Sequence, residues 1–270
     1  MKKLFISSII MNLLFLSILV SIPDIAKANM SKSPIITIIY DNNPYNPDLK
    51  TAWGFSCFIS GRKKNILFDT GGEGKILLEN MKKLGISPSQ VDIVFLSHIH
   101  GDHVGGLFAL LKENQNVTVY IPKSFPKSFK KRIKKHKAKF IEIHTPMKIF
   151  ENLYSTGEMG SFIKEQSLII TTNKGLIVIT GCAHPGVVRI AKKAKELLNK
   201  EIFLVIGGFH LVGSSKNRIK RIVDAFKKLK IKYVAPCHCS GDIARKLFKE
   251  SYGNHFIKTG VGSIIDIGKI

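Results

Sequence analysis

Cysteine is scarce in this sequence, which has only four among 270 residues, at positions 57, 182, 237 and 239. So few cysteines argue against a separate structural zinc site held by thiolates. One residue separates the last two, an awkward spacing for a disulfide between them. Because Cys182, Cys237 and Cys239 stand close to histidines in the chain, metal chemistry is the better interpretation, although a bridge from Cys182 to one of the later pair stays open.

Acidic residues and arginine are also few. Nineteen Asp and Glu stand against 42 Lys and Arg, and only six of the basic residues are arginine. The net charge of +23 could serve phosphate binding, but lysine spread along the chain is typical of a solvated surface, so we predict no specific nucleic-acid partner. One basic cluster, residues 123–140, could form a lid that attracts either an anionic substrate or an envelope surface. The alternative, which we favour, is a lysine-rich exposed helix.

The sequence has no linker rich in Pro, Gly or Ser, no low-complexity tract and no short repeat, which favours one domain. At the N-terminus, lysines 2 and 3 precede an apolar stretch over 4–23, and an Ala-Lys-Ala tripeptide ends at Ala28. This pattern indicates a signal peptide over residues 1–28; an uncleaved membrane anchor is the alternative. We expect export (periplasmic or secreted), cleavage near Ala28, and a mature domain of residues 29–270 without a transmembrane segment.

Strands and helices are predicted to alternate along the mature chain. Apolar, β-branched runs bounded by turn residues predict strands at 34–40, 54–60, 65–69, 91–97, 116–122, 167–172, 175–180, 201–207, 232–236 and 263–267. Apolar residues at three- and four-residue spacing predict helices at 74–85, 104–114, 186–199, 216–230 and 241–250. This order indicates an α/β (α+β) fold with helices packed outside two mixed sheets. Residues 147–161 are the best candidate for a junction between two halves.

Candidate metal ligands follow several of the predicted strands. The segment LSHIHGDHVGG, residues 96–106, places three histidines and an aspartate within six positions, and Asp69, His184, His210 and His238 follow other strands. Loops held by a rigid scaffold commonly carry binding residues, so we expect these side chains to converge at one edge of the sheets. The histidines at 136, 144 and 255 lack this setting and are interpreted as ordinary.

The residue types favour a transition metal. Imidazole and carboxylate ligands suit zinc, or iron and manganese, better than magnesium or calcium. His98 and His100, two residues apart on an extended loop, can chelate one ion, whereas Asp102 and His103 point towards a second. The glycines at 101, 105 and 106 permit the tight backbone that this requires. We therefore predict two divalent metal ions.

The motifs resemble the metallo-β-lactamase fold superfamily: H-x-H-x-D-H after a strand, D-T-G upstream, and isolated histidines after later strands. WGFSCFI, LFDTGG, LSHIHGDHVGGL, GCAHPG, GGFHL and PCHCSG look like one branch of it, which contains dihydropterin ribofuranosylaminobenzene 5'-phosphate synthase-like metallo-hydrolases. The resemblance covers residues 34–270 and implies a four-layer αββα sandwich with the metals at one edge. It also implies the ligands: His98, His100 and His184 for the first metal, and Asp102, His103 and His238 for the second.

Two further residues enter through the resemblance. Asp69 would accept a hydrogen bond from a ligand histidine and fix its orientation. At GGFHL the sequence departs from the superfamily, because His210 stands where most members have a bridging aspartate. We expect His210 to ligate one metal, with a role as proton donor to the substrate as the alternative. Cys237 and Cys239 could be thiols beside the ligands.

The predicted activity is metal-dependent hydrolysis of an ester or phosphoester, with a metal-bound hydroxide as nucleophile and Asp102 and His210 as catalytic residues. The basic surface is compatible with a small anionic substrate. One alternative is a pterin-type synthase, against which the signal peptide argues, because cofactor biosynthesis normally takes place in the cytoplasm. Another is a non-catalytic metal-binding protein on the same fold. A β-lactamase role fits export, but the motifs match another branch. The oligomeric state stays open.

Overall fold

The computed structural model describes residues 33–270, so the predicted signal peptide lies outside the described residues. Two sheets are present within them. The first has the order β13-β1-β2-β3-β4-β5-β6, built from β1 (Ile35–Tyr40), β2 (Ser56–Ser60), β3 (Ile66–Phe68), β4 (Ile93–Phe95), β5 (Thr118–Pro122), β6 (Lys139–Ile143) and β13 (Ile264–Asp266). The second has the order β12-β11-β10-β9-β8-β7, built from β7 (Met147–Phe150), β8 (Leu153–Ser155), β9 (Leu168–Thr172), β10 (Gly175–Thr180), β11 (Ile202–Gly208) and β12 (Tyr233–Cys237).

Each sheet is part antiparallel and part parallel. In the first sheet β13, β1, β2 and β3 pair antiparallel, and β3 to β6 run parallel. In the second, β10, β11 and β12 run parallel, and β7 to β10 pair antiparallel. Parallel strands are covered on both faces and therefore read as continuous apolar runs, as in β11, which is buried along its whole length.

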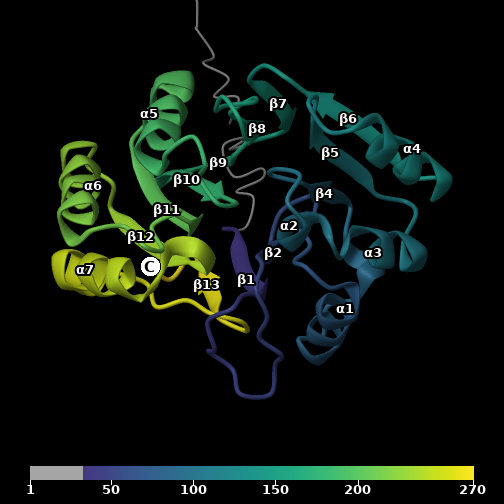
Figure 1. The fold of residues 1–270 in the computed structure, drawn as a ribbon, viewed down its shortest axis with the longest axis horizontal. Helices are drawn as coiled ribbons and strands as arrows, with labels where there is room; N and C mark the ends of the chain where they lie inside the picture. Colours follow the sequence, from purple (N-terminus) through teal and green to yellow (C-terminus); the bar gives the residue numbers. More distant parts are fainter. Residues whose placement is uncertain (1–32) are drawn as a thin grey trace, which may run out of the picture. The chain divides into compact units, whose positions relative to one another are not determined.

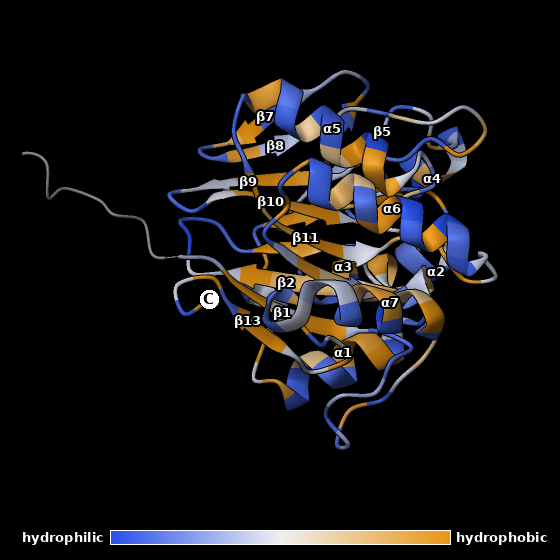
Figure 2. Cartoon of the chain, turned by 90° about the vertical axis from the view of Figure 1, so that its left-hand side faces the viewer, coloured by the Kyte–Doolittle hydropathy of each residue, from blue (hydrophilic) through white to orange (hydrophobic). Residues whose placement is uncertain are grey.

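Helices cover the outer face of each sheet (Figure 1). The first sheet carries α1 (Gly74–Lys83), α2 (Gly101–Val104), α3 (Leu107–Glu113) and α4 (Lys127–Lys135), and the second carries α5 (Val187–Leu198), α6 (Lys216–Lys228) and α7 (Asp242–Tyr252). Short 3₁₀ turns are η2 (Pro88–Gln90), η3 (His238–Ser240) and η4 (Gly253–His255). One side of each longer helix is apolar, and the polar sides of α5 and α6 face outwards (Figure 2).

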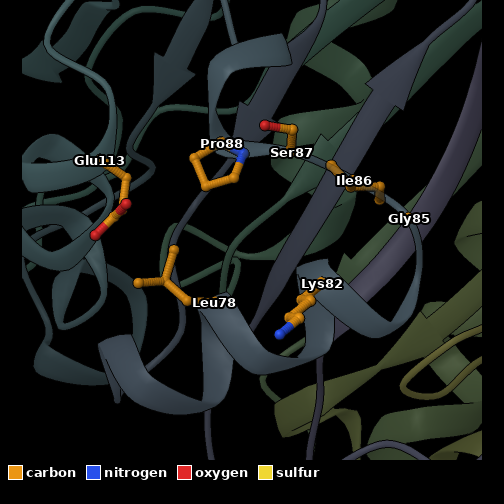
Figure 3. Close-up of a pocket in the computed structure, with 7 residues that line it drawn as sticks. All are labelled: Leu78, Lys82, Gly85, Ile86, Ser87, Pro88 and Glu113. Atoms are coloured by element: carbon orange, nitrogen blue, oxygen red, sulfur yellow. The ribbon is translucent and has the colours of Figure 1, made fainter.

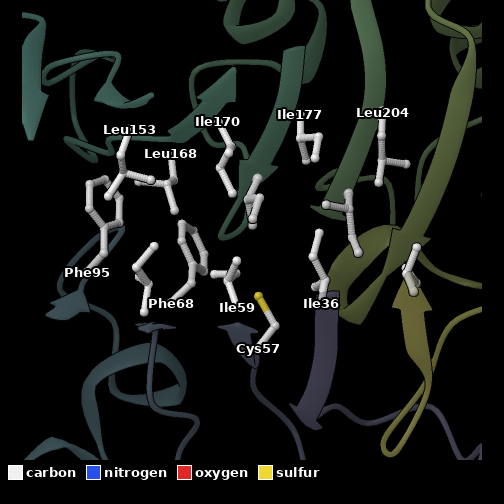
Figure 4. Packing of buried hydrophobic residues seen from close by; sticks show 14 of the residues in the cluster. Ile36, Cys57, Ile59, Phe68, Phe95, Leu153, Leu168, Ile170, Ile177 and Leu204 are labelled. Carbon is white, nitrogen blue, oxygen red and sulfur yellow. The ribbon is translucent and has the colours of Figure 1, made fainter. Parts of the chain in front are cut away.

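Three apolar layers hold these elements together. Between the sheets, Phe68 and Phe95 from the first sheet face Leu168 and Ile170 from the second (Figure 4). Two further clusters fill the space between each sheet and its helices. The predicted αββα sandwich is confirmed, as are the ten predicted strands and five predicted helices, with ends that differ by a few residues.

The strands β6, β7 and β8 and the short helix α2 were not predicted individually. The basic cluster 123–140 forms α4, with its lysines largely exposed and Ile133 buried, as the favoured interpretation predicts, and runs into β6. The predicted junction at 147–161 was placed a few residues too late, because residues 147–155 already form the β7–β8 hairpin of the second sheet. The chain changes sheets between β6 and β7. These strands lie at or beside a sheet edge, where polar residues weaken the strand pattern.

Two surface properties complete the fold. Among residues 33–270 there is no helix with the length and apolar character needed to cross a bilayer. A cavity of about 430 Å³ opens between the end of α1 and η2, lined by residues such as Leu78, Ile86 and Pro88 (Figure 3). Its lining contains no histidine or cysteine, so it is separate from the predicted ligands.

Candidate metal centre

The predicted ligands lie where parallel strands of both sheets end. In the first sheet, Asp69 follows β3, and the loop after β4 carries the HIHGDH segment. In the second, His184 follows β10, His210 follows β11 and His238 follows β12. Because the carboxyl ends of parallel strands meet at one edge of a sheet, all eight predicted site residues are delivered to the same place.

Three histidines form a first group. The ligand atoms of His98, His100 and His184 lie within 4.8 Å of one another. Nε2 of His98 is 3.1 Å from Nδ1 of His100, and the ring centroids of His98 and His184 are 4.7 Å apart. This is the set predicted for the first metal.

A second group contains Asp102, His103, His238 and one cysteine, Cys182, with ligand atoms within 4.8 Å of one another. One carboxylate oxygen of Asp102 lies 3.6 Å from Nε2 of His103 and 3.3 Å from Nε2 of His238. The structure therefore brings together the three residues predicted for the second metal. Cys182 was not predicted as a member.

A hydrogen-bond network orients a histidine of each group. Nδ1–H of His103 donates to the Asp69 carboxylate over 2.7 Å, and the Ser97 hydroxyl donates to the same oxygen over 2.7 Å. Nδ1 of His98 lies 2.9 Å from the Ser97 hydroxyl oxygen, which can accept its proton. Asp69 thus makes the kind of contact expected of it. Nε2 of His98 and Nε2 of His103 are left free to bind a metal ion.

Glu165 is a site residue that the sequence interpretation missed. Its carboxylate is buried and accepts Nδ1–H of His184 over 2.8 Å. It also accepts the backbone N–H groups of Cys182, Ala183 and His184 over 3.0, 2.8 and 2.9 Å. Burial by itself raises the pKa of Glu165, but the hydrogen bonds from His184 and the nearby histidines lower it to about 2. No local pattern distinguishes this glutamate, because its partners come from a later loop.

His238 has supporting residues from the segment after β1, which were also missed. Its Nδ1–H donates to the side-chain oxygen of Asn42 over 3.0 Å. Its backbone N–H donates to the buried carboxylate of Asp41 over 3.3 Å. The sequence YDNNP reads only as a turn, so the signal for this contact is absent from the local pattern.

Burial sets the protonation of two of the candidate ligand histidines, His98 and His103. It lowers the pKa of His98 well below its ordinary value and that of His103 to about 3, so both rings are neutral near pH 7. Burial raises the pKa of Asp102, but His238 and His103 nearby lower it overall. Neutral imidazoles beside an ionised carboxylate are the forms that bind a divalent cation.

The backbone is strained where it presents these side chains. Asp69, Ala183, His210 and His238 have positive φ angles of 51°, 60°, 53° and 46°. Non-glycine residues adopt this region rarely, and such strain clusters at functional sites. The described residues include eight non-glycine residues with positive φ, and half of them lie in the loops that carry the candidate site.

His210 stands apart from both predicted metal groups. It is exposed, its ring centroid is 4.6 Å from that of His184, and its ligand atom clusters with the sulfurs of Cys182 and Cys239 within 4.8 Å. All four cysteines are free thiols. Cys239 lies beside the site as expected, but Cys237 does not, because its side chain packs between the sheets together with Cys57.

The donor atoms fit bound cations. Nε2 of His238 is buried and lies 3.3 Å from a carboxylate oxygen of Asp102, yet it makes no hydrogen bond, a state that native proteins avoid. A divalent ion shared with Asp102 and His103 would satisfy this nitrogen. The close approach of His98 and His100 through ring nitrogens is likewise the arrangement that a shared ion would stabilise.

Comparison with known proteins agrees with the fold and the motifs. The sequence profile of the metallo-β-lactamase superfamily matches residues 54–188. A 7,8-dihydropterin-6-methyl-4-(β-D-ribofuranosyl)-aminobenzene-5'-phosphate synthase of Methanocaldococcus jannaschii is 32% identical, over 86% of this chain and 95% of its own. The chain therefore belongs to the metallo-β-lactamase superfamily, as its motifs predict.

Solved structures share the fold. A metal-dependent hydrolase of the β-lactamase superfamily matches with a TM-score of 0.73 and 29% identity, over 87% of this chain and 99% of its own. The short form of human tRNase Z matches with a TM-score of 0.60 and 16% identity, over 86% of this chain and 99% of its own, and shares the fold.

Proposed function

We propose that this chain is a dinuclear metal-dependent hydrolase of a small ester or phosphoester. The observation that carries the proposal is the pair of ligand groups at one sheet edge, three histidines in one and Asp102, His103 and His238 in the other. Similarity at 29% identity to a metal-dependent hydrolase of the same fold supports it. Zinc is the expected ion, with iron or manganese as alternatives.

Two divalent ions held there would activate a water molecule as nucleophile and stabilise the charge on the leaving oxygen. The chain's own residues supply orientation. Asp69, Glu165 and Asn42 each hold Nδ1 of one histidine, in His103, His184 and His238 respectively. His210 is exposed at the edge of the site beside His184, where it can give a proton to a substrate.

The surroundings of the site favour an anionic substrate with a flat group. Trp53 is 54% exposed, and its ring centroid lies 4.9 Å from that of His238. An exposed aromatic face beside the ligands can stack on a planar part of a substrate. The net charge of +23 attracts anions over the whole surface.

A pterin-type synthase is the second candidate, because the relative bearing that name is similar over nearly its whole length. The two activities differ in what they consume. A hydrolase turns over one substrate with water, whereas a synthase joins two substrates and forms no product when either is omitted.

Metal analysis of the purified protein, followed by a phosphodiester, lactone and β-lactam panel with and without chelator, tests the proposal. We expect about two ions per chain and a chelator-sensitive hydrolysis of at least one class. His100→Ala and Asp102→Ala should lose metal and activity while the circular dichroism spectrum is retained. His144→Ala is the matched control, because this exposed histidine pairs with Glu158 outside the site. Full metal content in the first two variants would overturn the assignment.

A further inference from the structure

We propose that the thiolate of Cys182 is a direct ligand of the second ion, together with Asp102, His103 and His238; this inference rests on the proposed metal centre. Cys182 follows β10 and is only 5% exposed. Its sulfur lies 3.1 Å from Nε2 of His103, and it lies within 4.8 Å of the ligand atoms of Asp102 and His238.

The ring nitrogen nearest to Cys182 is the one that the protein leaves free. Asp69 holds Nδ1–H of His103, so Nε2 carries the lone pair that a metal uses. A hydrogen bond from the thiol to Nε2 would explain this single contact. It would not explain why Asp102 and the unpartnered Nε2 of His238 converge on the same point. A shared cation explains why the ligand atoms of all four residues of the second group converge.

The loop after β10 carries one residue of each ligand group. Glu165 accepts the backbone N–H groups of Cys182, Ala183 and His184, which fixes the turn. Ala183 between them has a φ of 60°, so its neighbours can point in different directions. His184 then joins the first group and Cys182 joins the second. The loop after β4 divides its ligands in the same way, with His100 in one group and Asp102 in the other.

Charge balance favours a thiolate at this position. The ligands of the second group other than Cys182 carry one negative charge, that of Asp102, against two positive charges on a divalent ion. Coordination forms a metal–sulfur bond, breaks the S–H bond and releases the proton to solvent. The resulting thiolate brings the ligand charge to minus two. A soft sulfur ligand also favours zinc over manganese or magnesium at this position.

Cobalt substitution of the full chain tests the assignment. The metal-free protein is loaded with Co²⁺, its cobalt content is measured, and its near-ultraviolet absorption is recorded. We expect two ions and a sulfur-to-cobalt charge-transfer band in the wild-type protein. Cys182→Ser should lose the band and bind the second ion more than about 100-fold more weakly, since loss of a direct ligand exceeds the effect of a supporting residue.

Cys239→Ser is the matched control, because Cys239 is equally buried and lies beside the same site; this variant should keep the band. A band that persists in Cys182→Ser, or two bound ions without any band in the wild type, overturns the thiolate ligand and leaves the metal centre intact. Protein that takes up no cobalt overturns both. X-ray absorption of the wild-type zinc protein needs no variant, and the expected result is a sulfur neighbour at about 2.3 Å; a shell of nitrogen and oxygen alone contradicts it.

Discussion

Glu165 illustrates how much a single buried side chain can organise. It has no exposure to solvent beyond 1%, and it accepts four hydrogen bonds from one turn, including Nδ1–H of His184. A buried carboxylate is tolerated when its oxygens are satisfied in this way. Its removal therefore affects stability and the position of two proposed ligands, Cys182 and His184, together.

In the folded protein the pKa of Glu165, about 2, lies below the ordinary value of 4.5. Because each pKa unit corresponds to about 1.4 kcal/mol, Glu165→Gln should destabilise the metal-free protein by about 3 kcal/mol at pH 7. The ionised group thus contributes stability above about pH 4.5, and this contribution is lost as the pH falls towards 2. Urea denaturation as a function of pH should show the gap between wild type and variant shrinking below pH 4.5.

Glu201→Gln is the control for this measurement. Glu201 is 62% exposed and pairs with Lys195 over 2.7 Å at the surface, where such pairs contribute less than about 1 kcal/mol. A Glu165 variant no less stable than the Glu201 variant at pH 7 would contradict the assigned role.

His210 is the residue whose two predicted roles can be separated by one substitution. If it ligates an ion, His210→Ala should lower metal stoichiometry or affinity. If it donates a proton to the substrate, the variant should keep its metals and lose roughly 10²–10⁴ in rate. Its ligand atom lies with the sulfurs of Cys182 and Cys239 and outside both predicted groups, and this set could itself hold an ion, so the substitution is needed to separate the two roles. Metal content and kcat measured on the same preparation decide between them, and no change in either would leave His210 as a packing residue.

At the scale of elements, α2 and its two following glycines hold the second group in place. A Cβ atom at Gly105 would lie 2.0 Å from the carbonyl oxygen of Gly72, and one at Gly106 would lie 2.2 Å from that of Thr70. At Gly101 nothing lies within 4 Å. The predicted need for a tight backbone thus holds at positions 105 and 106, and position 101 has open space.

Gly105→Ala should lower the free energy of unfolding by about 1–3 kcal/mol, as overpacking against rigid backbone does. Because α2 carries Asp102 and His103, affinity for the second metal should fall as well. Gly101→Ala, on the same helix, should stay within about 0.5 kcal/mol of wild type. Denaturant melts and metal titration of both variants check this. Equal stabilities would show that α2 can move without cost.

At the scale of the whole molecule, each ligand group joins the two sheets. His98 and His100 come from the first sheet and His184 from the second, and Asp102 and His103 from the first are joined by His238 from the second. A bound ion in either group therefore links the two halves of the sandwich, in addition to the apolar layer between them.

Chelation should accordingly lower the melting temperature. A ligand at a hundredfold excess over its Kd stabilises the folded state by about 2.7 kcal/mol, which in a domain of this size corresponds to roughly 5–10 °C. Differential scanning calorimetry with and without chelator measures the change. His100→Ala should show a smaller chelator effect, and an equal effect in wild type and variant would speak against the first group as a metal site.

Export is a separate proposal about the whole chain. We propose that cleavage follows Ala28, so that exported protein begins at Asn29. N-terminal sequencing of material from outside the cytoplasm tests it, and material that retains Met1 contradicts cleavage.

How much could be read from the sequence depends on the range of the interactions. The four αββα layers and the division of the ligands into two sets were implied by the resemblance to a known family. The ten strands, the helices packed outside two mixed sheets and the candidate ligands after the strands follow from local signals, namely apolar runs, turn residues and ligand types directly after strands. These are properties of short segments, and the pattern survives because parallel strands buried on both faces must be apolar. The edge strands β6 and β7 gave weaker signals because one side of an edge is solvated.

Tertiary structure decided what depends on distant segments meeting. Glu165 beneath His184, Asn42 beside His238, Cys182 within the second group and Cys237 inside the core all depend on loops from different strands reaching one edge. A lone glutamate or cysteine has no periodic pattern to reveal its partner. The sequence by itself therefore determined the fold and the principal candidate ligands, whereas only the packing of the two sheets decided which residues orient those ligands and which thiol lies among them.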